Sequence, residues 1–401
     1  MTTADDRTVQ ASTTMNYDYT AAQPAGTHFA KYDALRSQSP WYRNDFGPGF
    51  WEVVNYEGIL QVLQDPQTFS SSVVTAMDPD PQYKWIPEML DGDEHRQWRR
   101  QLGPLFAPGA MERLDDTVRR RAIECVEAVA AKGSCDFIAD FAAQFPTTIF
   151  LEMMGLPADE LEQFMQWENA IMHSPPDAAG RDDAANAMGA VMGRFATVIA
   201  ERRADPRDDI VSKAVQYEID GNPVSDADLL SFCLLMFMAG LDTVTATLGW
   251  IFWHLADHPG DRQRLVDAPE TIPTAVEEYL RVFAIVTSAR RVTVDTTVQG
   301  CPMKAGDMVN LPLHAATRDD AAFANATAVD IARSPNNHIA FGAGPHRCLG
   351  SHLARRELRI AMEEWHRRIP HYRLDADVAL YETGGQVGLQ SLPLRWETTS
   401  P

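Results

Sequence analysis

The chain has 401 residues, of which 45% are hydrophobic and 23% are charged, a composition typical of a globular protein with a large core. Its net charge of −21 argues against nucleic acid or an anionic membrane surface as the main partner, because phosphate binding needs a basic footprint. The five scattered cysteines, with no CxxC pattern, favour free thiols in a reducing cytoplasm over a disulfide framework or a zinc site.

The N-terminal residues 1–28 are polar and acidic, with neither a basic segment nor an apolar segment. This pattern predicts no signal peptide and no membrane anchor. We expect these residues to form a loose arm over the surface. Residues 29–401 contain no Gly/Ser run, no Pro-rich spacer and no internal repeat, which favours a single domain.

Helical patterns dominate the chain, and short strand patterns lie near its two ends. Residues 40–55 alternate around "FGPGF", which predicts a β-hairpin, and a helix is expected from Tyr56 to Gln64. The pattern from 110 to 217 is helical, with breaks at Gly133, at 155–157, and in "SPPDAAGRDD" and "ADPRDD". Strand patterns return between 292 and 313 and in the tail. The chain is therefore expected to be mainly α with small β-sheets.

Residues 229–256 form an apolar stretch long enough to suggest a membrane span. Asp242 interrupts it, however, while "SDAD" supplies a capping box at its start and "DHPG" ends it. These features favour a central buried helix of a large domain. Within it, the Thr243 hydroxyl can bond the carbonyl of Ala239 and bend the helix, opening a small groove beside Gly240. By itself this pattern favours a packing kink over a functional groove.

Two further stretches contain residues of chemical interest. In "EEYLR", Glu278 and Arg281 share one helix face, as a solvated pair or as a buried one. In "FGAGPHRCLG", Cys348 lies in a glycine-rich loop before a predicted helix, whose N-terminus stabilises a thiolate. Three roles remain open for Cys348 on these grounds: a structural thiol, a nucleophile with His346 as its base, or an iron ligand.

The loop "FGAGPHRCLG" resembles the haem-binding loop of the cytochrome P450 family, FxxGxxxCxG, through Phe341, Gly344, Cys348 and Gly350. The resemblance implies that Cys348 is the thiolate ligand of the iron of haem b. Phe341 would then pack beside the sulfur. Loop N–H groups such as that of Gly342 would hydrogen-bond the sulfur and tune the reduction potential of the iron. The implied fold is a triangular, helix-rich single domain with a long central helix over the haem.

The same resemblance gives roles to the other two motifs. Glu278 and Arg281 are similar to the family's ExxR element, a buried pair that braces the fold behind the cysteine loop. "AGLDT" is similar to the family's oxygen-activation groove. It implies that Ala239 lies against the cofactor, that Thr243 takes part in oxygen activation, and that Asp242 relays protons from solvent.

Haem propionates need cations or donors, and the resemblance supplies candidates for them. "DEHRQWRR" is similar to the family's HxxxR element and contributes His95 and Arg99. Arg290, with Arg291 as the alternative, and His346 match further propionate partners.

The segment "QYKWIP" resembles the region of the camphor-hydroxylating bacterial enzymes in which a tyrosine contacts the substrate, so Tyr83 is a candidate polar contact. An apolar pocket is expected around it, with one hydrogen-bonding group. Its candidate residues are Tyr83, Trp85, Leu235, Met238, Val286 and Val387.

These motifs together imply a cytoplasmic haem-thiolate monooxygenase that inserts one atom of O2 into a C–H bond of an apolar, terpenoid-like molecule. No GxGxxG follows a strand, so electrons are expected from a separate ferredoxin, of the [2Fe-2S] or a similar type, and its reductase. The residues of this chain that are expected to dock the ferredoxin are Arg96, Arg100, Arg347, Arg355 and Arg356. The alternatives are a haem-thiolate enzyme that uses peroxide and a haem-thiolate sensor without catalysis.

Overall fold

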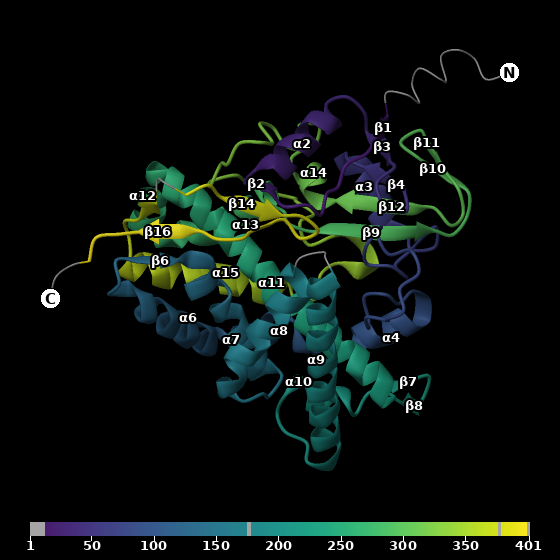
Figure 1. Cartoon of the computed structure of the whole chain (residues 1–401), viewed down its shortest axis with the longest axis horizontal. Helices are drawn as coiled ribbons and strands as arrows, with labels where there is room; N and C mark the ends of the chain where they lie inside the picture. The colour runs from purple at the N-terminus through teal and green to yellow at the C-terminus, as the bar shows by residue number, and fades with distance from the viewer. Residues whose placement is uncertain (1–12, 175–177, 376–377, 399–401) are drawn as a thin grey trace. The chain divides into compact units, whose positions relative to one another are not determined.

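The computed structural model describes residues 13–174, 178–375 and 378–398, and about 52% of the chain is helical (Figure 1). The mainly α prediction is therefore confirmed. The chain packs as two compact units, and each is described by itself. Unit 1 takes its described residues from Met1–Gln82, Glu270–Leu349 and Ala379–Gln390, and unit 2 from Tyr83–Pro269, Gly350–Val378 and Ser391–Pro401. The expected single domain over 29–401 stays a prediction.

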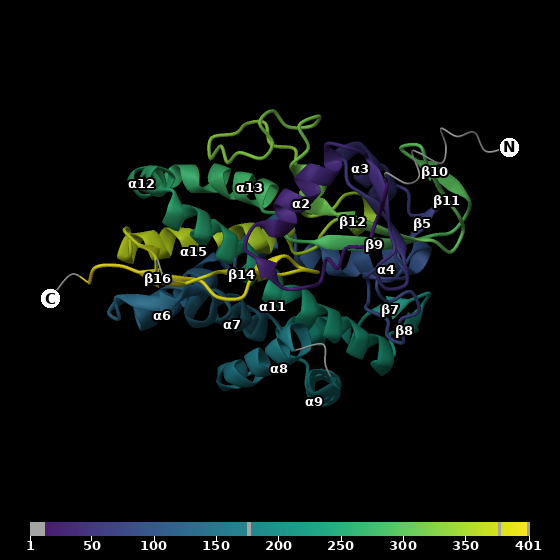
Figure 2. The ribbon, with the colours of Figure 1, turned by 45° about the horizontal axis from the view of Figure 1, so that its top comes forward.

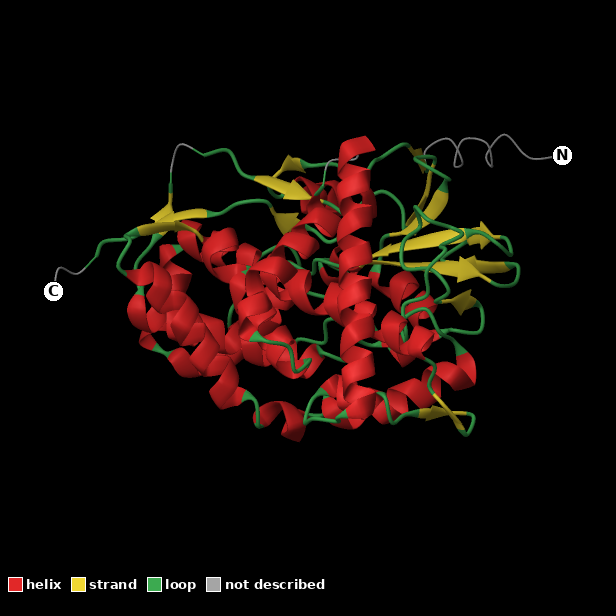
Figure 3. Ribbon diagram, turned by 60° about the horizontal axis from the view of Figure 1, so that its bottom comes forward, coloured by secondary structure: helices red, strands yellow, loops and turns green. Residues whose placement is uncertain are grey.

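Unit 1 is built on a six-stranded mixed sheet, drawn as arrows in Figure 3. Its strand order is β1 (Thr14–Met15), β3 (Trp41–Asn44), β4 (Phe50–Val53), β12 (Met308–Pro312), β9 (Thr287–Val292) and β5 (Phe69–Ser70). β3 and β4 form the predicted antiparallel hairpin, with Trp41 opposite Val53. β12 then pairs in parallel with β4 and antiparallel with β9. The strand patterns predicted near residue 50 and after residue 292 thus meet in one sheet.

The N-terminal segment corrects one expectation. Residues 1–12 of the predicted loose arm lie outside the described residues, but 13–28 are packed into unit 1. Thr14 and Met15 pair with β3, and β2 (Gln23–Pro24) joins a small sheet with β14 (Tyr381–Thr383) and β15 (Gly388–Leu389). Only 4% of Tyr19 is exposed. Aromatic burial in "MNYDY" outweighs the polar composition of the segment, so the arm is not loose there.

Unit 1 also contains helices. They are α2 (Thr27–Arg36), α3 (Tyr56–Gln64), α13 (Ile272–Val282) and α14 (Leu313–Thr317), with a 3-10 turn η5 (Gly344–His346). α3 has the predicted bounds, and the Asn55 side chain caps it by accepting a hydrogen bond from Gly58 N–H. The hairpin β10 (Thr296–Val298) and β11 (Cys301–Met303) completes the unit.

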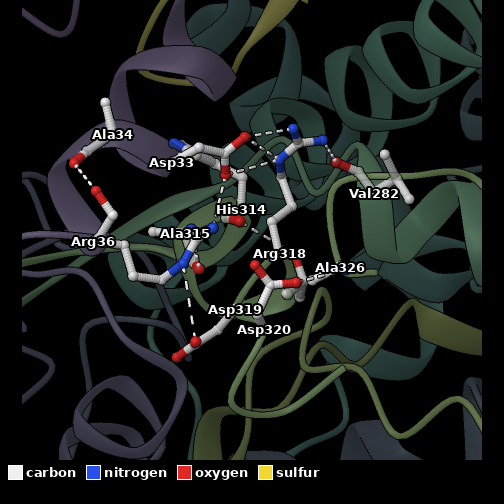
Figure 4. Close-up of polar contacts among 12 residues, drawn as sticks. Asp33, Ala34, Arg36, Val282, His314, Ala315, Arg318, Asp319, Asp320 and Ala326 are labelled. Atoms are coloured by element: carbon white, nitrogen blue, oxygen red, sulfur yellow. Dashed lines mark hydrogen bonds and ion pairs between the residues drawn. The ribbon is translucent and has the colours of Figure 1, made fainter. Parts of the chain in front are cut away.

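An ion cluster joins α2 to the segment around α14 (Figure 4). The Arg318 guanidinium bonds both carboxylate oxygens of Asp33, while Arg36 bonds Asp33 and the carbonyl of Ala315. Arg318 also donates to the carbonyl of Val282 at the end of α13. The side chains of Arg36 and Arg318 are 9% and 10% exposed, so these bonds fix three segments of unit 1 in a largely water-free region.

Unit 2 is the helical part of the chain (Figure 2). Its longer helices are α4 (Gly92–Leu102), α6 (Asp115–Ala130), α7 (Gln144–Met153), α8 (Leu161–His173), α9 (Ala178–Ala204), α11 (Asp226–Asp257), α12 (Pro259–Asp267) and α15 (Ser351–Arg368). Its short helices are η1 (Gly103–Leu105), α5 (Pro108–Glu112), the π-helical η2 (Ile138–Ala142), η3 (Ala158–Glu160) and α10 (Ile210–Ala214), and η4 (Pro269–Thr271) leads into unit 1. Its strands are β6 (Ser134–Asp136), β7 (Glu218–Ile219), β8 (Asn222–Pro223), β13 (Arg373–Leu374) and β16 (Pro393–Arg395).

The helix breaks of unit 2 largely follow the prediction. Gly133 and Gly155 have positive φ values of 74° and 66°, which glycine adopts without strain, and helices end near both. The stretch "SPPDAAGRDD" is an exception, because α9 already begins at Ala178 within it, while 175–177 lie outside the described residues. Alanine favours a helix, and that preference prevails over the polar residues around it.

The helix α11 has the bounds that its caps predict. Ser225 accepts a hydrogen bond from the Asp228 N–H at 3.1 Å, and the helix ends at Asp257. α11 is the one helix among the described residues that is long and apolar enough to cross a membrane, and 61% of its most apolar window is buried in the protein. A buried core helix has this same composition, which agrees with the prediction of a central helix.

Candidate functional site

The cysteine loop belongs to unit 1. The Cys348 N–H donates to the Phe341 carbonyl at 2.8 Å, which closes residues 341–348 into a compact loop. Gly344 has a positive φ of 68°, and a Cβ there would lie 2.3 Å from the Leu63 carbonyl oxygen at the end of α3. Only glycine therefore fits where the loop rests on α3. Gly342 also has a positive φ, of 70°.

Cys348 differs from the other cysteines in exposure. Its side chain is exposed, whereas Cys125, Cys135, Cys233 and Cys301 are buried, and none of the five forms a disulfide. Burial raises the pKa of Cys125, Cys135 and Cys301 to about 12, and that of Cys233 further still. Thiols of this kind stay protonated and do not bind metals readily. Cys348 is thus the cysteine whose surroundings suit a ligand.

Glu278 and Arg281 form a buried pair on α13 in unit 1. Arg281 donates to the two carboxylate oxygens of Glu278 at 2.8 and 2.7 Å, and neither side chain is exposed. Glu278 also accepts from Arg333, from Asn336 and from the Asp330 N–H. The pair therefore holds residues 330–336, the segment that leads into the cysteine loop. The alternative of a solvated surface pair is excluded.

Sequence reasoning did not identify Arg333 and Asn336 as members of this network. Both lie more than fifty residues from Glu278, in a segment without helix or strand periodicity. The pairing depends on tertiary structure, and the sequence carries no signal for it.

On α11, in unit 2, one face carries an accessible stripe. Leu235, Ala239 and Thr243 are spaced four residues apart and are partly or fully exposed, whereas Met238 and Asp242 are buried. Residues at this spacing lie on one helix face. The stripe contains three of the residues that the sequence assigns to the cofactor, the substrate and oxygen activation. Met238 lies off this stripe.

Thr243 makes the backbone contact that the sequence predicts. Its Oγ1 donates to the Ala239 carbonyl at 3.0 Å, and a Cβ on Gly240 would lie 3.3 Å from the Phe150 ring. The helix continues without interruption from Asp226 to Asp257, so the bond does not break α11. The Thr243 hydroxyl is thereby held at a fixed place on the accessible stripe.

Asp242 lies beside two groups that the sequence did not indicate. His173 Nε2 is 3.7 Å from Asp242 Oδ1 and 3.7 Å from Glu168 Oε1. Both partners come from α8, some seventy residues earlier in the chain, and no motif marks them.

The candidate propionate partners are divided between the units. Arg290 in β9 is 4% exposed, opposite Val309 in the sheet, and donates to the Ala289 carbonyl. Arg291 turns instead to the Pro79 carbonyl and Asp80, so Arg290 is the better candidate of the two. His346 ends η5 and is 9% exposed. In unit 2, α4 carries His95, which is buried, and Arg99, which is half-buried.

The residues predicted to line a substrate pocket lie in both units, and their contacts are described for each unit in turn. In unit 1, Val286 pairs with Gln386, and the Val387 N–H donates to the Ile285 carbonyl, so these two segments lie side by side. In unit 2, Tyr83 is 38% exposed, and its ring lies 5.3 Å from that of Trp85. The assignment of all these residues to a substrate pocket stays a prediction.

Unit 1 therefore offers one exposed thiol in a hydrogen-bonded loop, a buried guanidinium in β9 and a buried imidazole at the end of η5. A soft sulfur donor suits iron, and Arg290 and His346 suit carboxylates. This donor set fits haem b, which has one iron and two propionates. His95 and Arg99 in unit 2 add the same chemistry.

The comparisons with known proteins agree with haem b as the cofactor. Residues 52–368 match the family model "Cytochrome P450". A relative, probable cytochrome P450 127A1 of Sinorhizobium fredii, is 35% identical over 87% of this chain and 84% of its own. The methyl-branched lipid omega-hydroxylase of Mycobacterium tuberculosis is 33% identical over 87% of this chain and 85% of its own.

Solved structures match over almost the whole chain. The crystal structure of CYP101J2 has a TM-score of 0.88 at 28% identity, and the match covers 96% of this chain and 98% of that one. The chain belongs to the cytochrome P450 family, with that family's mainly α fold, its haem b cofactor and its monooxygenase type of activity.

Proposed function

We propose that this P450 inserts one atom of O2 into a C–H bond of an apolar small molecule that carries a single hydrogen-bonding group. The observation that carries the proposal is the accessible stripe on α11, with Thr243 on it and Asp242 directly beside it. A haem-thiolate sensor would have no use for a hydroxyl and a carboxylate at this place. An enzyme that activates oxygen needs both.

When bound, haem b supplies the activation of oxygen and its transfer to carbon. We assign the iron ligand to Cys348 Sγ, and the propionate contacts to Arg290, His346, Arg99 and His95. Phe341 and the N–H groups of the loop, that of Gly342 among them, shield the sulfur and set its basicity. Glu278 and Arg281 keep the loop in place from behind.

The chain's own acid–base groups hold and move protons. Thr243 Oγ1, fixed by its bond to the Ala239 carbonyl, presents its hydroxyl to the reacting oxygen. The Asp242 carboxylate supplies protons to that place. Thr243 and Asp242 are therefore the catalytic residues of the proposal.

The substrate class rests on the apolar candidates. We assign Leu235, Val286, Val387, Tyr83 and Trp85 to substrate binding, with Tyr83 as the single polar contact. The name of the methyl-branched lipid omega-hydroxylase relative supports an apolar substrate. The proposed substrate class is a terpenoid or a similar branched, apolar molecule. Met238 contributes less, because it is buried off the stripe.

Electrons come, in this proposal, from an acidic ferredoxin with its reductase in the cytoplasm. The docking arginines are Arg96, Arg100, Arg347, Arg355 and Arg356. Arg96 is paired with Asp93, and Arg356 with Asp115, so part of their charge is already compensated. Arg100 is exposed on α4 and keeps more of its charge available for a partner. Arg100→Glu should slow reduction and leave substrate affinity unchanged.

The experiment that tests the function starts from a compound library. Compounds that convert the ferric holoenzyme from low spin to high spin displace the water on iron and identify ligands of the pocket. The best of them is then incubated with NADH, ferredoxin and reductase under 18O2. The proposal expects a product with one 18O atom. A bound compound that stays unoxidised while NADH is consumed would contradict it.

A control with peroxide distinguishes the proposed monooxygenase from the alternative enzyme that uses peroxide. The same compound is incubated with hydrogen peroxide and without NADH. The proposal expects turnover with NADH to exceed turnover with peroxide. Efficient oxidation by peroxide alone would favour the peroxide-using enzyme instead.

A further inference from the structure

One imidazole lies between two carboxylates where α8 contacts α11 in unit 2. Figure 2 shows the two helices side by side. His173 Nε2 is equally distant, at 3.7 Å, from Asp242 Oδ1 on α11 and from Glu168 Oε1 on α8. These are ion-pair distances rather than hydrogen bonds. A single cation therefore compensates two carboxylates that would otherwise repel each other.

The side chains of His173, Glu168 and Asp242 differ in solvent exposure. The side chain of His173 is 35% exposed, that of Glu168 is 13% exposed, and that of Asp242 is 9% exposed. Asp242 is thus buried, and the group that connects it to the surface is an imidazole.

The electrostatics keep this imidazole charged at neutral pH. Burial lowers the pKa of His173, but its contacts with Asp242 and Glu168 outweigh burial and raise the pKa to about 10. Burial also raises the pKa of Glu168, an effect that His173 opposes and the charge of Asp242 adds to. α7, α9 and α11 pack against α8, and of their charged groups Asp242 acts most strongly on His173.

We propose that His173 is the positioning residue for Asp242, and that Glu168 is the alternative partner of the imidazolium. With equal distances to both carboxylates, His173 stays paired with Glu168 whenever Asp242 turns away from it. Asp242 can then move away from His173 and return to it at a low cost in free energy, because the imidazolium does not become unpaired. The inference rests on the proposed function, in which Asp242 supplies protons to the oxygen held near Thr243.

Two substitutions should act in opposite directions. His173→Gln removes the cation, so Asp242 loses its fixed position. Glu168→Gln removes the alternative partner, so the imidazolium binds Asp242 alone and holds it more tightly. His173→Lys keeps the positive charge and should restore part of the positioning. A merely structural histidine would not be replaced by lysine with retention of function.

The first test measures the pairing without any turnover. NMR of 15N-histidine-labelled, reduced and CO-bound holoenzyme follows the imidazole of His173 from pH 6 to 9, with His173→Gln as the assignment control. We expect a charged imidazole throughout in the wild type. Asp242→Asn and Glu168→Gln should each lower the His173 pKa by about one unit or more. Glu162→Gln, an exposed carboxylate on the same helix, should leave it unchanged.

The second test uses turnover with a compound from the spin-state screen. His173→Gln should raise the share of NADH that ends as peroxide by about twofold or more and increase the solvent deuterium isotope effect. His173→Lys should return both values toward those of the wild type. In an Asp242→Asn background, His173→Gln should have no further effect.

The outcomes separate the two proposals. A His173 imidazole that titrates near pH 6.5 in the wild type, or one that ignores Asp242→Asn, would overturn the pairing. Equal peroxide shares in the wild type and His173→Gln would overturn the positioning role. A wild-type enzyme that binds compounds but oxidises none would overturn the proposed function, while the titration would still decide the pairing.

Discussion

Arg281 holds Glu278 through two nitrogen–oxygen contacts of 2.8 and 2.7 Å, in a place where neither side chain is exposed. The remaining Arg281 donors reach the carbonyls of Thr317, Ala326 and Ala328. One side chain therefore ties α13 to the segment after α14. The Glu278 carboxylate ties α13 to residues 330–336 in the same way.

This network gives a prediction for stability. Glu278→Gln leaves Arg281 and Arg333 without their carboxylate in a buried place, which should cost about 3–5 kcal/mol of unfolding free energy. Urea unfolding of the holoenzyme measures it. Glu270→Gln, which changes an exposed carboxylate in η4, serves as the control and should cost less than about 1 kcal/mol. Equal losses in the two variants would show that the network is not a brace.

Thr243→Ala should affect chemistry more than stability. It removes one hydroxyl and one intrahelical bond, so the unfolding free energy should change by less than about 1 kcal/mol. The peroxide yield per NADH should rise, because the hydroxyl no longer holds the reacting oxygen. Thr247→Ala removes the equivalent bond, to the Thr243 carbonyl, one turn later and should keep the wild-type yield. A Thr243→Ala enzyme with unchanged product yield would remove Thr243 from the catalytic residues.

Arg290 and Arg291 permit a direct comparison of adjacent residues. Arg290 is buried in β9, whereas Arg291 is engaged with the Pro79 carbonyl and Asp80. Arg290→Gln should therefore speed the loss of haem to excess apomyoglobin by about tenfold, or about 1.4 kcal/mol of binding. Arg291→Gln should leave that rate near the wild-type value. The reverse order would move the propionate contact to Arg291.

Much of the fold follows from local sequence patterns. The hairpin at Trp41–Val53, the bounds of α3 and both ends of α11 could be predicted because caps and turn residues lie within a few positions of the element. The segment 13–28 could not, because its order depends on strand partners far along the chain.

The candidate site shows the same division. Cys348, Thr243, Glu278 and Arg281 stand in motifs whose spacing is visible in the sequence. The contact of Asp242 with His173 depends on how α8 packs against α11, and no spacing rule connects residues so far apart. Burial likewise separates Arg290 from Arg291, and it cannot be read from two adjacent arginines.

Glu357 on α15 gives a prediction for pH. Burial raises the pKa of this carboxyl to about 8, above its ordinary value of 4.5, and its side chain lies in the core. The folded protein therefore favours the protonated form, and stability falls as pH rises from 4.5 to 8. Glu357→Gln is neutral throughout, so relative to the wild type it should gain about 1–3 kcal/mol between pH 4.5 and pH 8.

Glu364, on the same helix, is the matched control. It is buried but paired with Arg119, Arg367 and Arg368, which together outweigh its burial and lower its pKa. Glu364→Gln should therefore lose stability at pH 8. Unfolding curves at pH 5 and pH 8 measure both variants. If Glu357→Gln gained nothing between the two pH values, the carboxyl would be ionised in the core at no cost, contrary to this prediction.

The ligation of iron by Cys348 is tested by the absorption spectrum of the reduced, CO-bound holoenzyme. The wild type should show the Soret band at the long-wavelength position of thiolate-ligated haem. Cys348→Ala should lose that band, and Cys125→Ala, which removes a buried thiol, should keep it. A wild-type band at the position of histidine-ligated haem, or a thiolate band that persists in Cys348→Ala, would contradict the assignment of the iron ligand.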